Sequence, residues 1–330
     1  MNYNKTNNIF GWICFLIASV TYILTLEPSA SYWDCGEFIS AAFKLQIVHQ
    51  PGAPLFLMIG KIFSLMAGSD LTRVACWINI SSALASAATI LFLFWTITAL
   101  VKKVVLKPGD EITTARMISI MGSGVVGALA YAYSDSFWFS AVEAEVYALS
   151  SLCTAIVFWA ILKWDAHAEE PDADKWLVFI AYIMGLSIGV HLLNLLVIPA
   201  IAFLYYFKKE KNPTTGGSIL TFFIGCFILG FIQYGIVQYL IKFAAYSDLL
   251  FVNTLGLGFG SGVIFFILLV IITLAAGIFY TIKGVKLHLI IAAASFIALM
   301  TIGGGLWGLV SALILLAILE FILKIQQHRR

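Results

Sequence analysis

Two acidic residues stand three positions apart in the polar segment that follows the first apolar run. They belong to Trp33-Asp34-Cys35-Gly36-Glu37-Phe38. If residues 33–45 form a helix, Asp34 and Glu37 share one face. Acids near a lipid boundary are costly unless they are solvated, paired or functional. One could act as a general base on a hydroxyl while the other orients a nucleophile or a cation. The other interpretation is a helix start, where acids complement the dipole.

A bend follows the acids. Residues 48–56 read Val-His-Gln-Pro-Gly-Ala-Pro-Leu-Phe, so two prolines and a glycine precede an apolar segment. This bend could bring the acids back over the mouth of a helix bundle. His49 could donate to a phosphate or accept a proton. It could equally be a solvated residue of an interfacial turn.

Cations follow the bend. Lys61 and Arg73 stand nearest the lipid boundary that the hydropathy predicts. A lipid phosphate needs positive charge at headgroup depth, and Arg can grip it with two hydrogen bonds. Ordinary interfacial anchors also fit each residue.

Two later segments hold further candidates. Residues 133–147 contain three acids and several aromatic residues, with no Lys or Arg. Carboxylates and aromatic faces together suit a carbohydrate, although aromatic belts at membrane interfaces look similar. The candidates are Glu143, Glu145 and Tyr147, of which the two glutamates cannot share one helical face. His191 and Asn194 could line a polar cavity or form a helix-packing pair.

The composition identifies the setting. Of 330 residues, 62% are hydrophobic and 11% charged, against about a quarter charged in soluble domains. So many apolar residues cannot all be buried in one soluble core, but apolar runs of about 20 residues can face lipid as membrane-spanning helices. The net charge of +2 indicates no nucleic-acid partner. The five cysteines have no metal-ligand spacing, so we expect neither a disulfide framework nor a cysteine metal site. Cys35 stands apart from the others because it lies in a polar loop.

These runs predict an all-α, polytopic membrane bundle of about ten spans with a large first outer loop. We expect one transmembrane domain over 1–330, with 27–73 as the outer loop carrying the acids and 74–330 as the remaining bundle. The first run reads as a retained span. The predicted spans are 9–26, 74–101, 117–134, 146–164, 176–190, 192–207, 218–241, 260–280, 287–302 and 306–323.

The cations set the predicted orientation. Placing 27–73 outside, with 53–67 at the interface or packed on the bundle, leaves only four of the 19 Lys and Arg residues outside. If residues 53–67 crossed the membrane, every later segment would change sides and the uneven distribution of Lys and Arg would be lost. Membrane lipids are therefore expected partners.

The chain also resembles a known family. The motif 33–38, residues 49–55, residues 143–147 and His191 after Gly185-Leu186-Ser187 look like signatures of the bacterial membrane proteins called domain of unknown function 2723. These are now glycosyltransferase family 117 and are similar to protein O-mannosyltransferases and other GT-C enzymes. The resemblance covers roughly residues 9–210. Gln50 departs from it, because a second proline is common there.

The resemblance implies a GT-C bundle on the bacterial inner membrane whose periplasmic first loop carries the catalytic acid. Asp34 would be the first choice of base and Glu37 the second, with His49, Lys61 and Arg73 at the donor phosphate. The implied donor is a polyprenyl-phosphate sugar and the acceptor a protein or glycan hydroxyl. A divalent metal could assist, and no cofactor is specified. Members often continue into a further C-terminal region, so this chain would be a short member or a fragment.

Two rival functions remain open. A transporter or lipid flippase would explain many spans, but it would place charges nearer the bilayer midplane than these loops do. A membrane scaffold without catalysis would make the outer acids dispensable.

Overall fold

The computed structural model describes residues 2–107 and 109–328, leaving aside the side chains of 281 and 318–328. Every regular element in this part is helical, as the sequence predicts. The terminal Arg329 and Arg330, which we assign to the inner side, lie outside the described residues. Two compact units, 1–229 and 230–330, divide the chain and are described separately.

Unit 1 is built around one long helix. That helix, α4 (Val74–Val105), contacts α1 (Tyr3–Leu24), α5 (Thr114–Ala132) and α7 (Val146–His167). Small residues let the helices approach closely, as membrane bundles require. A Cβ added to Gly124 of α5 would lie 2.6 Å from the Thr98 side chain. The first half of α4 is correspondingly rich in buried serine and alanine.

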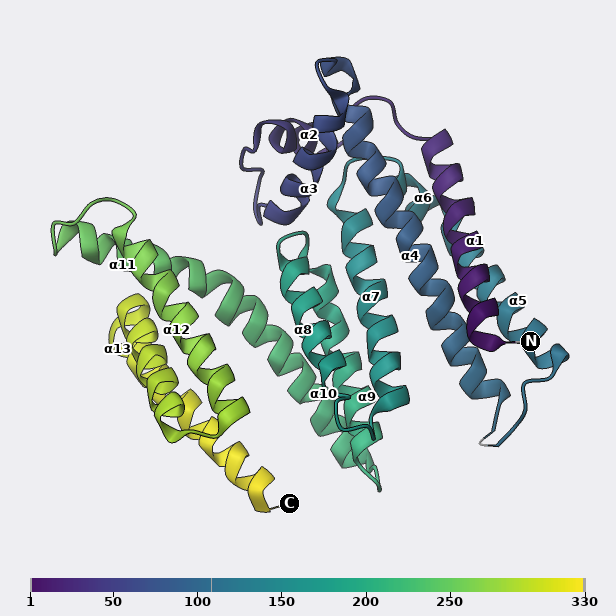
Figure 1. Ribbon diagram of the computed structural model, residues 1–330. Coiled ribbons are helices and arrows are strands. Elements are labelled where there is room, and N and C mark those ends of the chain that lie inside the picture. The colour runs from purple at the N-terminus through teal and green to yellow at the C-terminus, as the bar shows by residue number, and fades with distance from the viewer. Residues whose placement is uncertain (1, 108, 329–330) are drawn as a thin grey trace. The chain divides into compact units, whose positions relative to one another are not determined.

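The remaining elements of unit 1 are shorter. The outer loop contains α2 (Cys35–Lys44) and α3 (Pro54–Ser64), while α6 (Asp135–Ala141) precedes α7. Figure 1 shows α2, α3 and α6 near one end of α4, and the N-terminus near its other end. Completing the unit are α8 (Lys175–Ile188), the 3-10 turn η3 (Leu192–Val197), α9 (Ile198–Lys209) and most of α10 (Thr215–Gly230).

A hydrophobic cluster packs the outer loop against the bundle. Phe38 of α2 packs edge-on against Phe56 of α3, with ring centroids 5.2 Å apart. Ile78 of α4 and Val190, before η3, belong to the same cluster. The backbone N–H of Leu55 also donates to the Gly189 carbonyl at 2.7 Å. The predicted segment 53–67 thus packs against the bundle through α2 and α4, as one of our two alternatives anticipated.

Unit 2 contains a π-helical stretch (Phe231–Gln238), α11 (Tyr239–Asn253), α12 (Ser261–Lys283) and α13 (Lys286–His328). The predicted spans 287–302 and 306–323 both lie within α13, which is interrupted at Gly305 (φ 56°). Two helices therefore follow one another across this kink, as the two predicted spans anticipate, and Gly305 tolerates the positive φ because it lacks a Cβ.

Among the described residues, eight helices are long and apolar enough to cross a membrane, against about ten predicted spans. The predicted span 176–190 became α8, whose 14 residues extend about 21 Å. That length is shorter than the hydrocarbon core of about 30 Å.

The eight long apolar helices found among the described residues make the chain a multi-pass helical membrane protein. The helices that are long and apolar enough to cross are Tyr3–Leu24, Leu71–Val105, Thr114–Ala132, Val146–His167, Leu192–Lys209, Thr215–Asn253, Ser261–Tyr280 and Lys286–Ala317.

Candidate functional site

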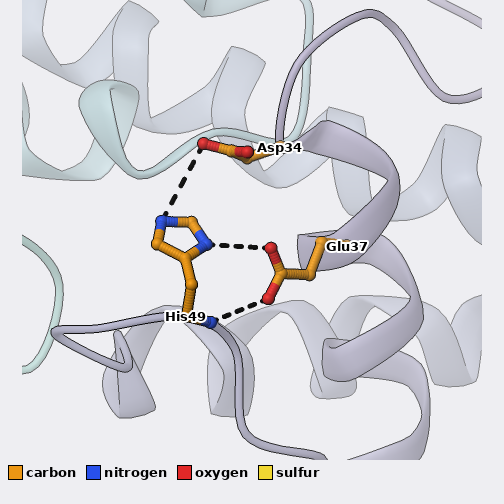
Figure 2. A group of neighbouring side chains, drawn as sticks. All are labelled: Asp34, Glu37 and His49. Atoms are coloured by element: carbon orange, nitrogen blue, oxygen red, sulfur yellow. Dashed lines mark hydrogen bonds and ion pairs between the residues drawn. The ribbon is translucent and has the colours of Figure 1, made fainter.

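The bend after α2 brings His49 between the two acids of the motif. Its Nδ1 lies 2.8 Å from Glu37 Oε2, and its Nε2 lies 3.8 Å from Asp34 Oδ2. Figure 2 shows the imidazole between the carboxylates, both of which come from the start of α2. The ring also packs edge-on against Phe38, with centroids 5.7 Å apart. Asp34, Glu37 and His49 thus form one polar cluster, the Asp34 cluster, although His49 lies twelve positions beyond Glu37 in the chain.

Glu37 is committed to holding His49. Besides the imidazole, it accepts the backbone N–H of His49 at 2.7 Å. These hydrogen bonds lower the pKa of Glu37, because they stabilise its charged form. The hydrogen bond to Glu37 in turn raises the pKa of His49, aided by the nearby charge of Asp34. This arrangement makes Glu37 a positioning group for the imidazole.

Asp34 is the freer acid. It occupies the N-cap of α2, yet its side chain makes no capping hydrogen bond. The usual capping role of an aspartate is therefore unused, although its charge still lies at the positive end of a helix. The side chain is 58% exposed, against 43% for Glu37. Asp34 can consequently accept a proton from an incoming group, and the cluster is open to solvent.

The two glutamates of the second outer segment are buried. Glu143 is 4% exposed and Glu145 6% exposed. Burial raises the pKa of Glu143, and burial together with the charges of Glu143 and Asp34 raises the pKa of Glu145 to about 7. The Glu143 Oε2 atom has no hydrogen-bond partner among the described residues. Buried in this way, the glutamates present little surface to a sugar, and the charge of Glu145 makes only a minor contribution to the raised pKa of His49.

Cys35 is also buried. Its side chain is 0% exposed and belongs to the cluster that fastens α2 and α3 to the bundle. Burial raises the pKa of its thiol. The sequence set Cys35 apart from the other cysteines as a residue of a polar loop, and this interpretation was wrong. Helix α2 begins at Cys35 and turns its side chain into the hydrophobic cluster, while Asp34 stays exposed.

The two predicted phosphate-binding cations have other surroundings. The Lys61 ammonium donates to the carbonyl oxygen of Phe43 at the end of α2 and lies 4.8 Å from the centroid of that ring. Arg73 is exposed at the start of α4, where its charge helps to lower the pKa of Asp70. Among the described residues, the ion pairs of the Asp34 cluster run only to His49.

The remaining candidates form a neighbouring group. The rings of Tyr147 and His191 lie 5.5 Å apart, and Tyr147 is 48% exposed. His191 Nδ1 accepts the backbone N–H of Leu193 at 3.2 Å, and burial lowers the pKa of His191. Asn194 is fully buried and donates to Ser187 Oγ at 3.0 Å. Asn194 therefore bonds to Ser187 rather than to His191, whereas Tyr147 stays accessible.

Sequence reasoning missed one residue that positions the acid loop. Asn79 of α4 is fully buried and donates to the carbonyl oxygens of Glu27 (2.6 Å) and Ser29 (3.0 Å). It therefore ties down the chain just before the acid motif. The available signal was an amide side chain within an apolar span, where polar residues are costly and commonly have a partner.

The cluster also carries suitable donors for a cation. One ligand atom from each of Asp34, Glu37 and His49 lies within 4.8 Å of the others. Carboxylate and imidazole ligands suit Mn²⁺ or Zn²⁺. With Nδ1 bonded to Glu37, the Nε2 atom faces Asp34, an arrangement that resembles the carboxylate-oriented histidines of metal sites.

Comparison with known proteins gives the site a context. Residues 34–214 match the family model described as Protein O-mannosyl-transferase TMEM260 N-terminal domain. The chain belongs to this family. The matched region contains the whole Asp34 cluster and the residues from Glu143 to Asn194.

Two relatives carry the same name. The chain is 24% identical over 232 residues to Protein O-mannosyl-transferase tmem260 of Dictyostelium discoideum, and 25% identical over 204 residues to Protein O-mannosyl-transferase TMEM260 of Mus musculus. These alignments cover 67% and 61% of this chain. The chain spans about a quarter of each relative, 26% in both cases. No solved structure matches it.

Proposed function

We propose that this family member is a membrane glycosyltransferase that moves a sugar from a polyprenyl-phosphate donor to an acceptor hydroxyl. The carrying observation is the cluster in which His49 lies between Glu37 and an uncapped, exposed Asp34. The relatives' name, protein O-mannosyl-transferase, supports mannose as the sugar and a protein as the acceptor. A glycan acceptor remains within the same chemistry.

In the proposed reaction, Asp34 removes the proton from the acceptor hydroxyl. The acceptor oxygen then bonds to the anomeric carbon as the bond from that carbon to the phosphate oxygen breaks. The electron pair leaves with the polyprenyl phosphate, and the configuration inverts. Asp34 suits the role of base because its carboxylate makes no capping bond, whereas Glu37 is occupied by His49.

The departing phosphate requires positive charge. His49, whose pKa is raised by its bond to Glu37, can supply it as an imidazolium. Lys61 and Arg73 stay candidates for the same phosphate, with the Lys61 ammonium first having to leave the Phe43 carbonyl. A divalent cation on Asp34 and His49 is the alternative source of charge, and it would neutralise the phosphate as it forms.

The proposal places this chemistry in a GT-C bundle of the bacterial inner membrane, with the cluster facing the periplasm. It is supported by the position of α2, α3 and α6 near one end of α4. It is also supported by the small share of Lys and Arg in the predicted outer segments. A donor tail in the bilayer and a phosphate at the interface would then meet Asp34 at headgroup depth.

A transporter or flippase and a non-catalytic scaffold remain the competing functions. A transporter would couple flux to charges near the bilayer midplane, whereas the Asp34 cluster lies outside the helices that can cross. Substrate flux in proteoliposomes without sugar transfer would favour it. A scaffold would still complement a deletion strain when both Asp34 and Glu37 are replaced.

Incubation of the purified chain with mannosyl-phosphoryl-polyprenol and an acceptor protein, followed by mass spectrometry of the products, tests the function. We expect Asp34→Asn to lower turnover by at least about 100-fold, as loss of a general base does. Asp135→Asn is the matched control, since Asp135 is an acid of the other outer segment that the proposed reaction does not use. Near-normal turnover by folded Asp34→Asn protein would remove Asp34 from the role of base.

A further inference from the structure

Two consecutive aromatic side chains next to Asp34 are almost fully exposed. Tyr32 is 82% exposed and Trp33 is 90% exposed. Aromatic side chains of this size usually contribute their large apolar surface to a core or an interface. Neither the fold nor the proposed chemistry uses these two rings, although both lie directly before the candidate base.

The backbone conformation at Trp33 contributes to this exposure. Its φ of 60° lies in the left-handed region, which residues with a Cβ rarely adopt. Asp34, the next residue, already has helical angles as the N-cap of α2. Such conformations persist where the surrounding structure holds them, and they concentrate at ligand sites. An exposed indole therefore directly precedes an exposed carboxylate in the chain.

The first outer loop carries exposed aromatic residues and exposed acids in succession along the chain. The sequence places aromatic residues and acids together in 133–147, but Glu143 and Glu145 are buried there. In the first outer loop, by contrast, Trp33 directly precedes Asp34 in the chain, and the Asp34 and Glu37 carboxylates and the His49 imidazole are all substantially exposed. An aromatic face with hydrogen-bonding groups at its edge is the combination that a pyranose ring requires.

We propose that Trp33 is the stacking surface for the pyranose ring of the glycosyl substrate. The apolar C–H face of the sugar lies on the indole, and hydroxyls at the rim of the ring reach the Asp34 carboxylate. The inference rests on the proposed function and deepens it, because it names the group that holds the sugar next to the base. Trp33 is a binding residue in this scheme and takes no part in bond making.

A membrane anchor is the competing role, since tryptophan is common at membrane interfaces. The two roles respond differently to substitution. Anchoring needs only apolar area, so leucine would replace tryptophan. Stacking needs an aromatic ring, so phenylalanine would retain much of the function and leucine would not.

The experiment titrates methyl α-mannopyranoside into the detergent-solubilised full chain and follows binding by saturation-transfer NMR. We expect Trp33→Leu to weaken binding about two- to tenfold, while Trp33→Phe stays near the original protein. Trp12→Leu is the control, because Trp12 is half exposed on α1. Unchanged binding in Trp33→Leu, or an equal loss in Trp12→Leu, would overturn the inference.

A third variant separates binding from folding. Trp33→Gly removes the ring while tolerating the positive φ, so it should fold at least as well as the original protein and still lose binding. Retained binding in Trp33→Gly would also overturn the inference.

A sugar-transfer assay run beside the binding titration separates this inference from the proposed function. If the original protein transfers no sugar while binding still depends on Trp33, the proposed function fails and the stacking surface stands. If sugar transfer is normal while binding is insensitive to Trp33, the stacking surface fails and the proposed function stands.

Discussion

Replacing Glu145 with glutamine should make the protein more stable at pH 8 than at pH 5, relative to the original chain. Glu145 is 6% exposed, and its pKa is raised from 4.5 to about 7, first by burial and then by neighbouring acids. The folded protein therefore holds this proton up to about pH 7, whereas the unfolded chain releases it above about pH 4.5.

The direction of the effect follows from proton linkage. Between pH 4.5 and about 7, the folded state binds more protons at Glu145 than the unfolded state, so stability falls as pH rises. Below pH 4.5 both states are protonated and the penalty is absent. Above about pH 7 the penalty is complete, because folding then requires a buried carboxylate.

The magnitude follows from the same values. The interval from 4.5 to about 7, at about 1.4 kcal/mol per pH unit, gives at most about 3.5 kcal/mol. Local relaxation and water penetration reduce the penalty of a buried charge in real proteins, so about 1.5 kcal/mol is the working value. For a chain of this size, that corresponds to a change in melting temperature of roughly 2–4 °C.

The assay is thermal unfolding in detergent, followed by circular dichroism at half-unit steps from pH 4.5 to 8.5. The measured quantity is the difference in melting temperature between Glu145→Gln and the original protein at each pH, so that any constant cost of the amide cancels. Glu169→Gln serves as the control, because Glu169 is exposed. A difference that stays constant across the range, or that matches the Glu169→Gln difference, would refute the reasoning from burial.

Three other predictions concern packing and polar contacts. Gly124→Val should destabilise the bundle by about 2 kcal/mol or more, because its Cβ would lie within 3 Å of α4 side chains. Gly122→Ala is the control and should be neutral in thermal unfolding, because the space around Gly122 is open. Asn79→Ala should cost about 1–3 kcal/mol and increase hydrogen exchange in the loop before the acid motif, since two buried hydrogen bonds are lost. Glu37→Gln should lower the pKa of His49, measured by histidine NMR, because the charged acceptor of its Nδ1 proton is gone; an unchanged pKa would argue against the contact.

The sequence by itself determined the class of the protein and offered the candidate residues for its chemistry. Apolar runs of membrane-spanning length have few structural solutions, because every backbone polar group in lipid must be paired within the segment. Helices were therefore predictable, and so was a bend after the acids, since prolines and glycine restrict the backbone locally. The contact of His49 with both acids was not predicted. The break between the predicted spans 287–302 and 306–323 was also predictable, because a glycine tolerates the positive φ at Gly305 where the two helices of α13 meet.

Only the tertiary structure decided what each acid can do. Asp34, Glu37, Glu143 and Glu145 are equivalent carboxylates in the sequence, yet the first is uncapped and exposed, the second holds His49, and the last two are buried. These differences arise from contacts between segments far apart in the chain, such as the packing of α2 and α3 on α4. Burial and hydrogen bonding set the proton affinity of a carboxyl group, and both are properties of its surroundings rather than of its place in the chain.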